Sequence, residues 1–308
     1  MDTVSFDTID KIRLHIDRIE KRFVLLADRK KWLQLTAALD VLEDSSWAVV
    51  YYIESDYPSD VRGKYLFTYG LLQALFLQQD AVKSINEALF DKSVDIKQNY
   101  PRAHLVREMR NDVSGHPTTR NGGKEFIYLS QHSMEKDSFE YMKEIPENSE
   151  PLFIPVDVFA TIEENAKYVN AVLENTKDEL DKEFREYIDA HRGREMKKIF
   201  STLHYAREKV VLNSPLKAQM YENTKTMVSK CKDEIIQRFG SLKSADSYYY
   251  LFEDIDKIYS LIDTGLNLIP QTIRSDIEKY LIEVLFINLE KLEQYSIETD
   301  EYFNSIGE

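Results

Sequence analysis

One short segment of the sequence gathers the residue types that could carry out chemistry. It runs from Arg107 to Pro117 and reads REMRNDVSGHP. An arginine grips a phosphate through two hydrogen bonds and stabilises the charge that develops on its oxygens. A histidine can move a proton between two oxygens near neutral pH, and a neighbouring amide can orient it. Arg110, Asn111 and His116 therefore supply the groups needed for metal-independent RNA cleavage, in which a ribose 2′-hydroxyl attacks its own phosphate.

The residues between Arg110 and His116 are expected to bring these two side chains together. Val113, Ser114 and Gly115 are poor helix formers, and a residue before proline avoids helical backbone angles. We therefore predict that a helix ends after Arg110 and that the chain then turns to place His116 beside the arginine.

This spacing resembles the R-x4-6-H motif of the HEPN superfamily, in which a polar residue follows the arginine. Here the motif consists of Arg110, Asn111, four further residues and His116. Proteins of this superfamily are α-helical bundles, are frequently dimeric, and include many metal-independent endoribonucleases of toxin, anti-phage and RNA-processing systems. The resemblance implies that Arg110 and His116 are catalytic, that Asn111 supports them, and that the chain is a homodimeric endoribonuclease of a defence, toxin or stress system.

Two alternatives use the same segment without catalysis. In the first, the chain is a HEPN-like nucleotide- or protein-binding regulator that acts through its dimer surface, with an arginine paired to Asp112 and His116 bonded to the loop backbone. A regulatory protein partner would fit that alternative. In the second, the chain is a purely structural helical adaptor, which leaves the basic segment unexplained.

The charge distribution favours RNA over other polyanionic partners. The net charge of −14 over 308 residues argues against a nucleic-acid coat, a double-stranded DNA binder or a membrane-surface protein. Between residues 101 and 124, however, five basic and two acidic side chains give a local balance of +3. Within it, Arg107 lies one helical turn before Arg110, and Arg120 and Lys124 follow the motif. We expect these three residues to bind substrate or to support the site.

A polar set on the preceding helix is a further candidate. Gln78, Gln79 and Asp80 interrupt an apolar run, and Gln73 lies seven residues before Asp80 on the same helical face. Polar groups inside a core helix need partners. Asp80, with Gln79, is therefore predicted to reach the motif loop and support the site. The alternative is that Asp80 faces water at the rim of the bundle.

The expected fold is mainly α-helical. Only nine glycines and eight prolines occur, and eight of these seventeen lie between residues 101 and 155. Helical periodicity predicts helices over residues 31–53, with Trp47 facing inward, and over residues 64–90 and 101–110. Residues 125–129 and 138–142 are predicted to pair as a β-hairpin. We accordingly divide the chain into an HEPN-like bundle at 1–117, an irregular segment with the hairpin at 118–155, and C-terminal helices at 156–308.

The cysteine and histidine content bears on whether the site holds a metal ion. A single cysteine, Cys231, excludes a disulfide framework, and the six histidines show no metal-ligand spacing. We therefore expect neither metal nor cofactor, and the lack of a signal-like N-terminus or a long apolar run predicts a cytoplasmic protein. A second basic cluster at residues 191–209, with a balance of +4, is either an extension of an RNA groove or a solvated helix face. Residues 276–308 hold nine acidic and two basic residues, a balance of −7.

Overall fold

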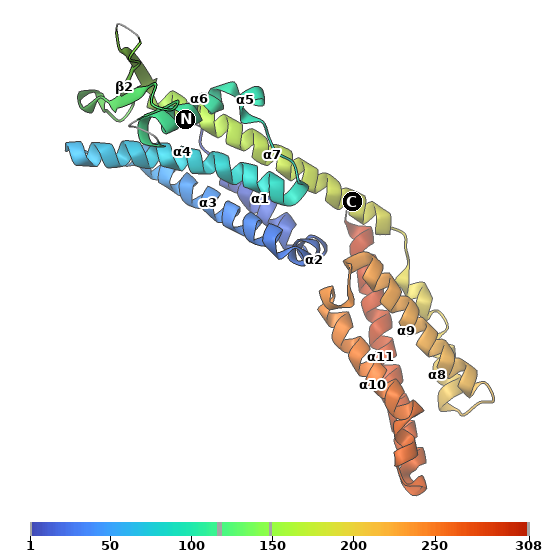
Figure 1. Ribbon diagram of the computed structural model, residues 1–308. Helices are drawn as coiled ribbons and strands as arrows, with labels where there is room; N and C mark the ends of the chain where they lie inside the picture. Colours follow the sequence, from blue (N-terminus) through green and yellow to red (C-terminus); the bar gives the residue numbers. More distant parts are fainter. Residues whose placement is uncertain (1, 116–118, 148–149, 307–308) are drawn as a thin grey trace. The chain divides into compact units, whose positions relative to one another are not determined.

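The computed structural model describes residues 2–115, 119–147 and 150–306 (Figure 1). The chain is mainly helical and carries one small antiparallel sheet of three strands. It divides into two compact units. The first consists of Met1–Ile16 and Leu25–Asp181, and the second consists of Asp17–Val24 and Lys182–Glu308. The first unit thus combines the motif helix with the strands and the start of a long helix that the sequence analysis assigned to separate segments.

The helices of the first unit pack around a shared apolar core. Their bounds are α1 (Phe6–Asp17), α3 (Arg29–Glu54), α4 (Val61–Phe90), α5 (Ile96–Asn99), α6 (Pro101–Arg110) and the first part of α7 (Val158–His191), with α2 (Ile19–Ala27) at the boundary of the units. Figure 1 shows α1, α3, α4 and α7 running alongside one another, and Ile12, Leu42, Val82 and Leu173 share one buried cluster. This core fixes the positions of α4 and α6, which carry most of the candidate site.

Local sequence signals account for the ends of these helices. Asp28 and Asp60 cap α3 and α4 by accepting hydrogen bonds from the first backbone amides, and Pro101 occupies the first turn of α6. The predicted helices at 31–53, 64–90 and 101–110 are confirmed within three residues. The inward position of Trp47 is wrong, because its side chain lies 57% exposed and packs its ring against Phe6 instead.

The α-helix ends at Arg110, as predicted, but the predicted turn directly after it is not found. The chain continues as a π-helix, η1 (Asn111–Gly115), which is a wider turn than an α-helix. Val113, a poor α-helix former, lies in this turn and is buried in the core with the strands. The predicted position of His116 beside Arg110 lies outside the described residues.

The small sheet covers the end of the first unit near α6. Its strands are β1 (Phe126–Leu129), β2 (Ser138–Glu144) and β3 (Leu152–Asp157), paired in the order β1-β2-β3. The β1–β2 pair, in which Phe126 faces Glu144, confirms the predicted hairpin. Strand β3 differs from the prediction that helices resume from Val156. Phe139, Tyr141 and Val156 bury the inner face of the sheet against α4 and α6.

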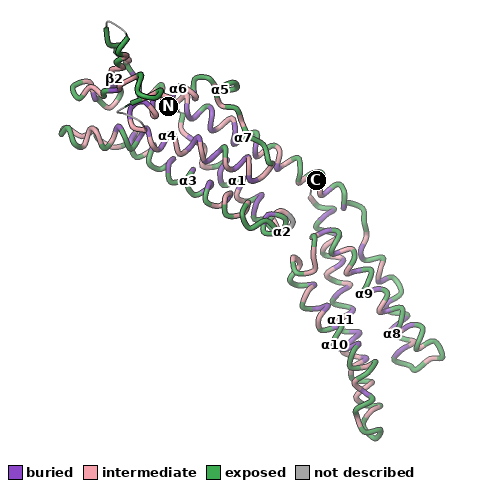
Figure 2. The backbone as a smooth tube through the Cα atoms, viewed as in Figure 1, coloured by how far each residue is buried: buried purple, intermediate pink, exposed green. Residues whose placement is uncertain are grey.

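The second unit is a separate set of packed helices. It contains the end of α7, η3 (Met196–Phe200), α8 (Leu203–Val211), α9 (Lys217–Phe239), η4 (Leu242–Ser244), α10 (Asp246–Asp263), η5 (Gly265–Leu268) and α11 (Gln271–Ser305). Its core includes Phe200, Cys231, Phe252 and Leu289. Figure 2 shows buried and exposed positions alternating along these helices, as expected of helices that pack one face. Within the described part of the chain, no helix combines the length and apolar character needed to span a bilayer.

Candidate functional site

Two arginines of α6 stack on one aromatic ring of α4. Arg107 and Arg110 are three residues apart, so both point to the same side of α6. The guanidinium carbon of each lies 4.1 Å from the centroid of the Phe76 ring. Arginine is attracted to the face of an aromatic ring by its quadrupole, and such stacking restricts the guanidinium plane. Phe76 therefore holds both arginines in defined positions at the surface of the first unit.

Arg110 is held by amide oxygens. Gln73 Oε1 accepts hydrogen bonds from Arg110 Nε at 3.3 Å and from Nη2 at 2.7 Å, and Asn111 Oδ1 accepts one from Nη1 at 3.1 Å. Within residues 2–115, 119–147 and 150–306, Arg110 has no carboxylate at ion-pair distance. Because amides orient the guanidinium without neutralising it, its positive charge stays available to an anion.

Gly115 allows the end of the π-helix to lie close to this guanidinium. A Cβ atom added to Gly115 would lie 2.6 Å from Arg110 Nη1 and 3.3 Å from Asn111 Oδ1. The hydroxyl of Ser114 donates to the carbonyl of Arg110 at 3.2 Å, which ties the wide turn back to α6. The absence of a side chain at Gly115 is thus part of what lets Arg110 adopt its observed position.

The buried Asp112 carboxylate pairs with two basic side chains, one from the segment before β1 and one from β2. It is 4% exposed, and its carboxylate lies 2.8 Å from Arg120 Nε and 3.1 Å from Lys143 Nζ. Arg120 also contacts Glu108 at 2.7 Å. Burial and the Asp112 carboxylate raise the pKa of Tyr141 to about 12. The arginine that pairs with Asp112 is therefore Arg120, and among the described residues Arg110 has no carboxylate at ion-pair distance.

The other predicted residues occupy different surroundings. Asp80 pairs with Arg107 at 2.8 Å, and so reaches the motif helix while remaining partly exposed. Gln79 is buried and donates to the carbonyl of Ala103 and to Asn165 Oδ1, so it contacts α6 away from Arg110. Lys124 lies in the exposed turn before β1.

Phe76, Gln73 and Gly115 complete the cluster around the predicted residues. In the sequence, Gln73 is readable on the Asp80 face without a role, Gly115 is readable as a poor helix former in the turn, and contacts of Phe76 or Gly115 with Arg110 are not predicted. The spacing did contain a signal for Phe76, since it lies three residues after Gln73 and four before Asp80, on the same helical face.

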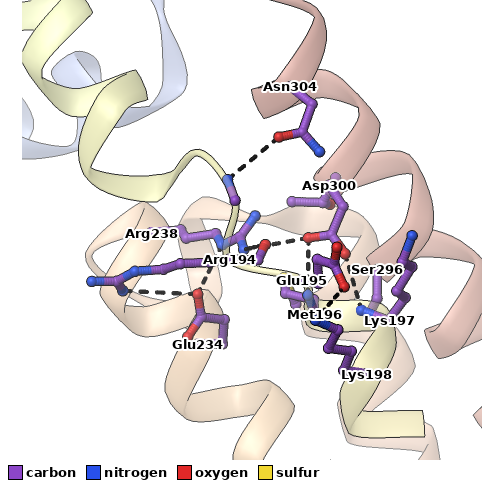
Figure 3. A network of polar contacts seen from close by, with 12 residues as sticks. Arg194, Glu195, Met196, Lys197, Lys198, Glu234, Arg238, Ser296, Asp300 and Asn304 are labelled. Atoms are coloured by element: carbon purple, nitrogen blue, oxygen red, sulfur yellow. Dashed lines mark hydrogen bonds and ion pairs between the residues drawn. The ribbon is translucent and has the colours of Figure 1, made fainter. Parts of the chain in front are cut away.

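Most basic side chains of the 191–209 cluster form ion pairs with carboxylates of the second unit. Arg207 pairs with Glu283 and Glu290 of the acidic helix α11, and Lys198 pairs with Glu195. Figure 3 shows the centre of this network, where buried Arg238 of α9 bonds to Glu234, to the carbonyl of Arg194 and to Asp300. The contacts of Arg238 bind α9, α11 and the segment between α7 and η3 together.

Comparisons with known proteins and a search for metal-ligand clusters do not assign a function to this site. No protein-family model, curated protein or solved structure matches the chain. Among the described residues, no group of three or more histidine, cysteine, aspartate or glutamate side chains is placed to hold a metal ion. The HEPN resemblance stays a prediction from the motif.

Proposed function

We propose that the chain is a metal-independent endoribonuclease and that Arg110 clamps the scissile phosphate. The observation that carries this proposal is the uncompensated charge of Arg110, which is oriented by Gln73 and Asn111 and stacked on Phe76. A preorganised guanidinium stabilises the charge that develops on phosphate oxygens in the transition state, and it pays no cost of rearrangement.

His116 is assigned the proton transfers. In the proposed reaction it takes the proton of the ribose 2′-hydroxyl as the 2′-oxygen bonds to phosphorus, and it gives that proton to the 5′-oxygen as the bond between phosphorus and the 5′-oxygen breaks. The products are a 2′,3′-cyclic phosphate and a 5′-hydroxyl end. Support comes from Gly115, the residue before His116 in the sequence, because Gly115 lies against the Arg110 guanidinium. Asn111 acts as a positioning residue through its bond to Arg110.

The neighbouring charges support a localised site. Arg107 and Arg120 are engaged by carboxylates, and Arg102 pairs with Glu164 at 3.3 Å. Among the described basic residues of this segment, Arg110 and the exposed Lys124 therefore have no carboxylate at ion-pair distance, and of these two only Arg110 is stacked and held by amides. A small cationic site on an acidic protein favours contact with one phosphate over binding along a whole duplex.

The proposal is tested by incubating labelled RNA with purified protein in EDTA. Wild type is expected to cleave it and to leave cyclic phosphate ends, and His116→Ala and Arg110→Ala are expected to cleave about 100-fold more slowly or worse. Arg102→Ala is the charge-matched control, since Arg102 lies on the same helix and is mostly exposed. Intact RNA with wild type, or equal cleavage by either site variant, rejects the nuclease. Binding of RNA without cleavage supports the regulator instead.

A homodimer is part of the same proposal. Leu66 and Tyr69 lie exposed on the face of α4 that carries Gln73, and Leu66 is 71% exposed. An apolar patch beside a catalytic group suits an interface that encloses the substrate. Sedimentation equilibrium of wild type and Leu66→Glu tests this: a dimer that the charge dissociates is expected, and a monomeric wild type contradicts it.

A further inference from the structure

A small polar cavity adjoins the Arg107 end of the stack on Phe76. Its volume is about 200 Å³, and its walls come from α4, the segment between α4 and α5, α6 and α7. Arg107 and Gln79 both line it. The volume is below the roughly 300–1,000 Å³ of pockets for drug-sized ligands, so it suits one heterocyclic base and not a larger molecule.

Gln79, one of the residues that line this cavity, carries an unpaired acceptor among the described residues. The residue is 2% exposed, and its Oε1 has no hydrogen-bond partner within the described part of the chain. The orientation of the amide is fixed, because Nε2 donates to Ala103 O at 2.9 Å and to Asn165 Oδ1 at 2.8 Å. Asn165 in turn donates to Gln78. A buried acceptor without a donor costs free energy, which a ligand that donates a hydrogen bond would recover.

The charged groups of the cavity balance one another. Arg107 and Lys83 are opposed by Asp80 and Asp95, and Arg107 is already paired with Asp80. The cavity therefore suits a neutral ligand with a polar edge, in contrast to the uncompensated cation at Arg110. Tyr168 also lines it, and burial raises the pKa of Tyr168 to about 12, so its hydroxyl keeps its proton at neutral pH.

Phe76 connects this cavity with the phosphate clamp. Arg107 lines the cavity and stacks on Phe76, and Arg110 stacks on the same ring. The two guanidinium carbons each lie 4.1 Å from the ring centroid, so their separation cannot exceed the sum of these distances. A nucleotide chain that places a phosphate at Arg110 can therefore reach the cavity with an adjacent base.

We infer that the cavity at Gln79 binds a nucleobase that carries an exocyclic amino group, on a nucleotide next to the phosphate at Arg110. The amino group of cytosine or adenine donates to Gln79 Oε1, whereas uracil presents a carbonyl oxygen at the corresponding edge. This inference rests on the proposed function and adds a base preference to it.

The test measures binding of oligo(C) and oligo(U) of equal length by fluorescence anisotropy. Both carry 2′-O-methyl groups, which prevent attack by the 2′-oxygen. The two pyrimidines have similar size, so the comparison isolates the amino group. Wild type is expected to bind oligo(C) about tenfold more tightly than oligo(U). Gln79→Met is expected to reduce this ratio to about twofold or less.

Two further variants keep the test decisive. Asn86→Leu is the matched control, because Asn86 is a buried amide of α4 that belongs neither to this hydrogen-bond network nor to the cavity lining, and it is expected to retain the preference. Ser93→Trp fills the cavity from an exposed position outside the core, and it is expected to abolish the preference even if Gln79→Met does not fold. Equal binding of both oligonucleotides by wild type, or a preference that survives Gln79→Met or Ser93→Trp, overturns the inference.

The outcomes separate this inference from the nuclease proposal. A preference for oligo(C) that depends on Gln79, in a protein that leaves unmodified RNA intact, supports the base site and rejects the nuclease. Cleavage by wild type without a preference for oligo(C) supports the nuclease and rejects the base site. Cytidine monophosphate distinguishes the source of the base: if it binds through Gln79 and oligo(C) does not displace it, the RNA-bound form of the inference is overturned.

Discussion

Gln73 accepts two hydrogen bonds from Arg110 through a single amide oxygen, at 3.3 Å from Nε and 2.7 Å from Nη2. A carboxylate at this position would form similar bonds and cancel the charge. The choice of an amide therefore separates the two tasks of orienting the arginine and preserving its charge. Substitutions at Gln73 can test these tasks one at a time.

Gln73→Glu is expected to lower RNA cleavage while leaving the fold intact. The carboxylate keeps Arg110 in place but forms an ion pair with it, so the guanidinium binds phosphate less strongly, and a loss of about tenfold or more in kcat/KM is expected. Gln73→Leu, which removes the acceptor and adds no charge, is the comparison. Steady-state cleavage at several salt concentrations measures both, and full activity of Gln73→Glu would contradict this role of the charge.

Gly115→Ala is expected to impair cleavage with little effect on stability. The new Cβ would lie 2.6 Å from Arg110 Nη1, so the guanidinium, at the end of a flexible side chain, has to move. A displacement of this size at a catalytic group can cost about 100-fold in rate. Gly70→Ala is the control, because an added Cβ there meets nothing within 4 Å. Unchanged cleavage by Gly115→Ala would show that the position of Arg110 does not matter.

Arg238→Met is expected to destabilise the second unit. The Arg238 side chain is 0% exposed, and its loss leaves Asp300, which is 6% exposed, without its buried cation. Breaking a buried pair from one side typically costs about 3–5 kcal/mol in the free energy of unfolding. Arg194→Met, at a half-exposed position of the same network, is expected to cost less than about 1 kcal/mol. Urea denaturation measures both, and equal losses would contradict the importance of burial.

The contribution of Glu125 is expected to depend on pH. Hydrogen bonds from Asn121 and Lys143 hold the pKa of the Glu125 carboxylate below its ordinary value. The ionised form therefore stabilises the hairpin above the unfolded pKa of about 4.3, and this contribution is lost as the pH falls through the lower folded value. Glu125→Gln should thus lower the Tm at about pH 7 and have a smaller effect below about pH 3. A difference that grows on acidification would have the wrong sign.

The sequence predicted those parts of the structure that depend on local patterns. Helical spacing and proline placed α6 at its observed residues, and alternation with turn residues placed the β1–β2 hairpin. Strand β3 (Leu152–Asp157) was not predicted because it contains Pro155, and proline argues against a strand except at a sheet edge. In the structure β3 is an edge strand of the sheet.

The contacts of the site were less accessible, because they depend on residues distant in the chain. Asp112 pairs with Arg120, from the segment before β1, and with Lys143 of β2, and spacing along α6 cannot reveal these partners. The stack of Arg107 and Arg110 on Phe76 similarly needs the packing of α4 against α6. The sequence therefore identified the residues of the motif, but it did not identify the side chains that orient or neutralise them.

The division of the chain into units has a consequence for the order of folding during synthesis. Every residue of the first unit has been made once the ribosome reaches Asp181. Asp17–Val24, by contrast, belongs to the second unit, where Arg18 stacks on Phe184 and Lys21 pairs with Glu183. This early segment must wait for residues made more than 150 positions later, and such late contacts slow folding. The candidate site can therefore assemble on the nascent chain before the second unit exists.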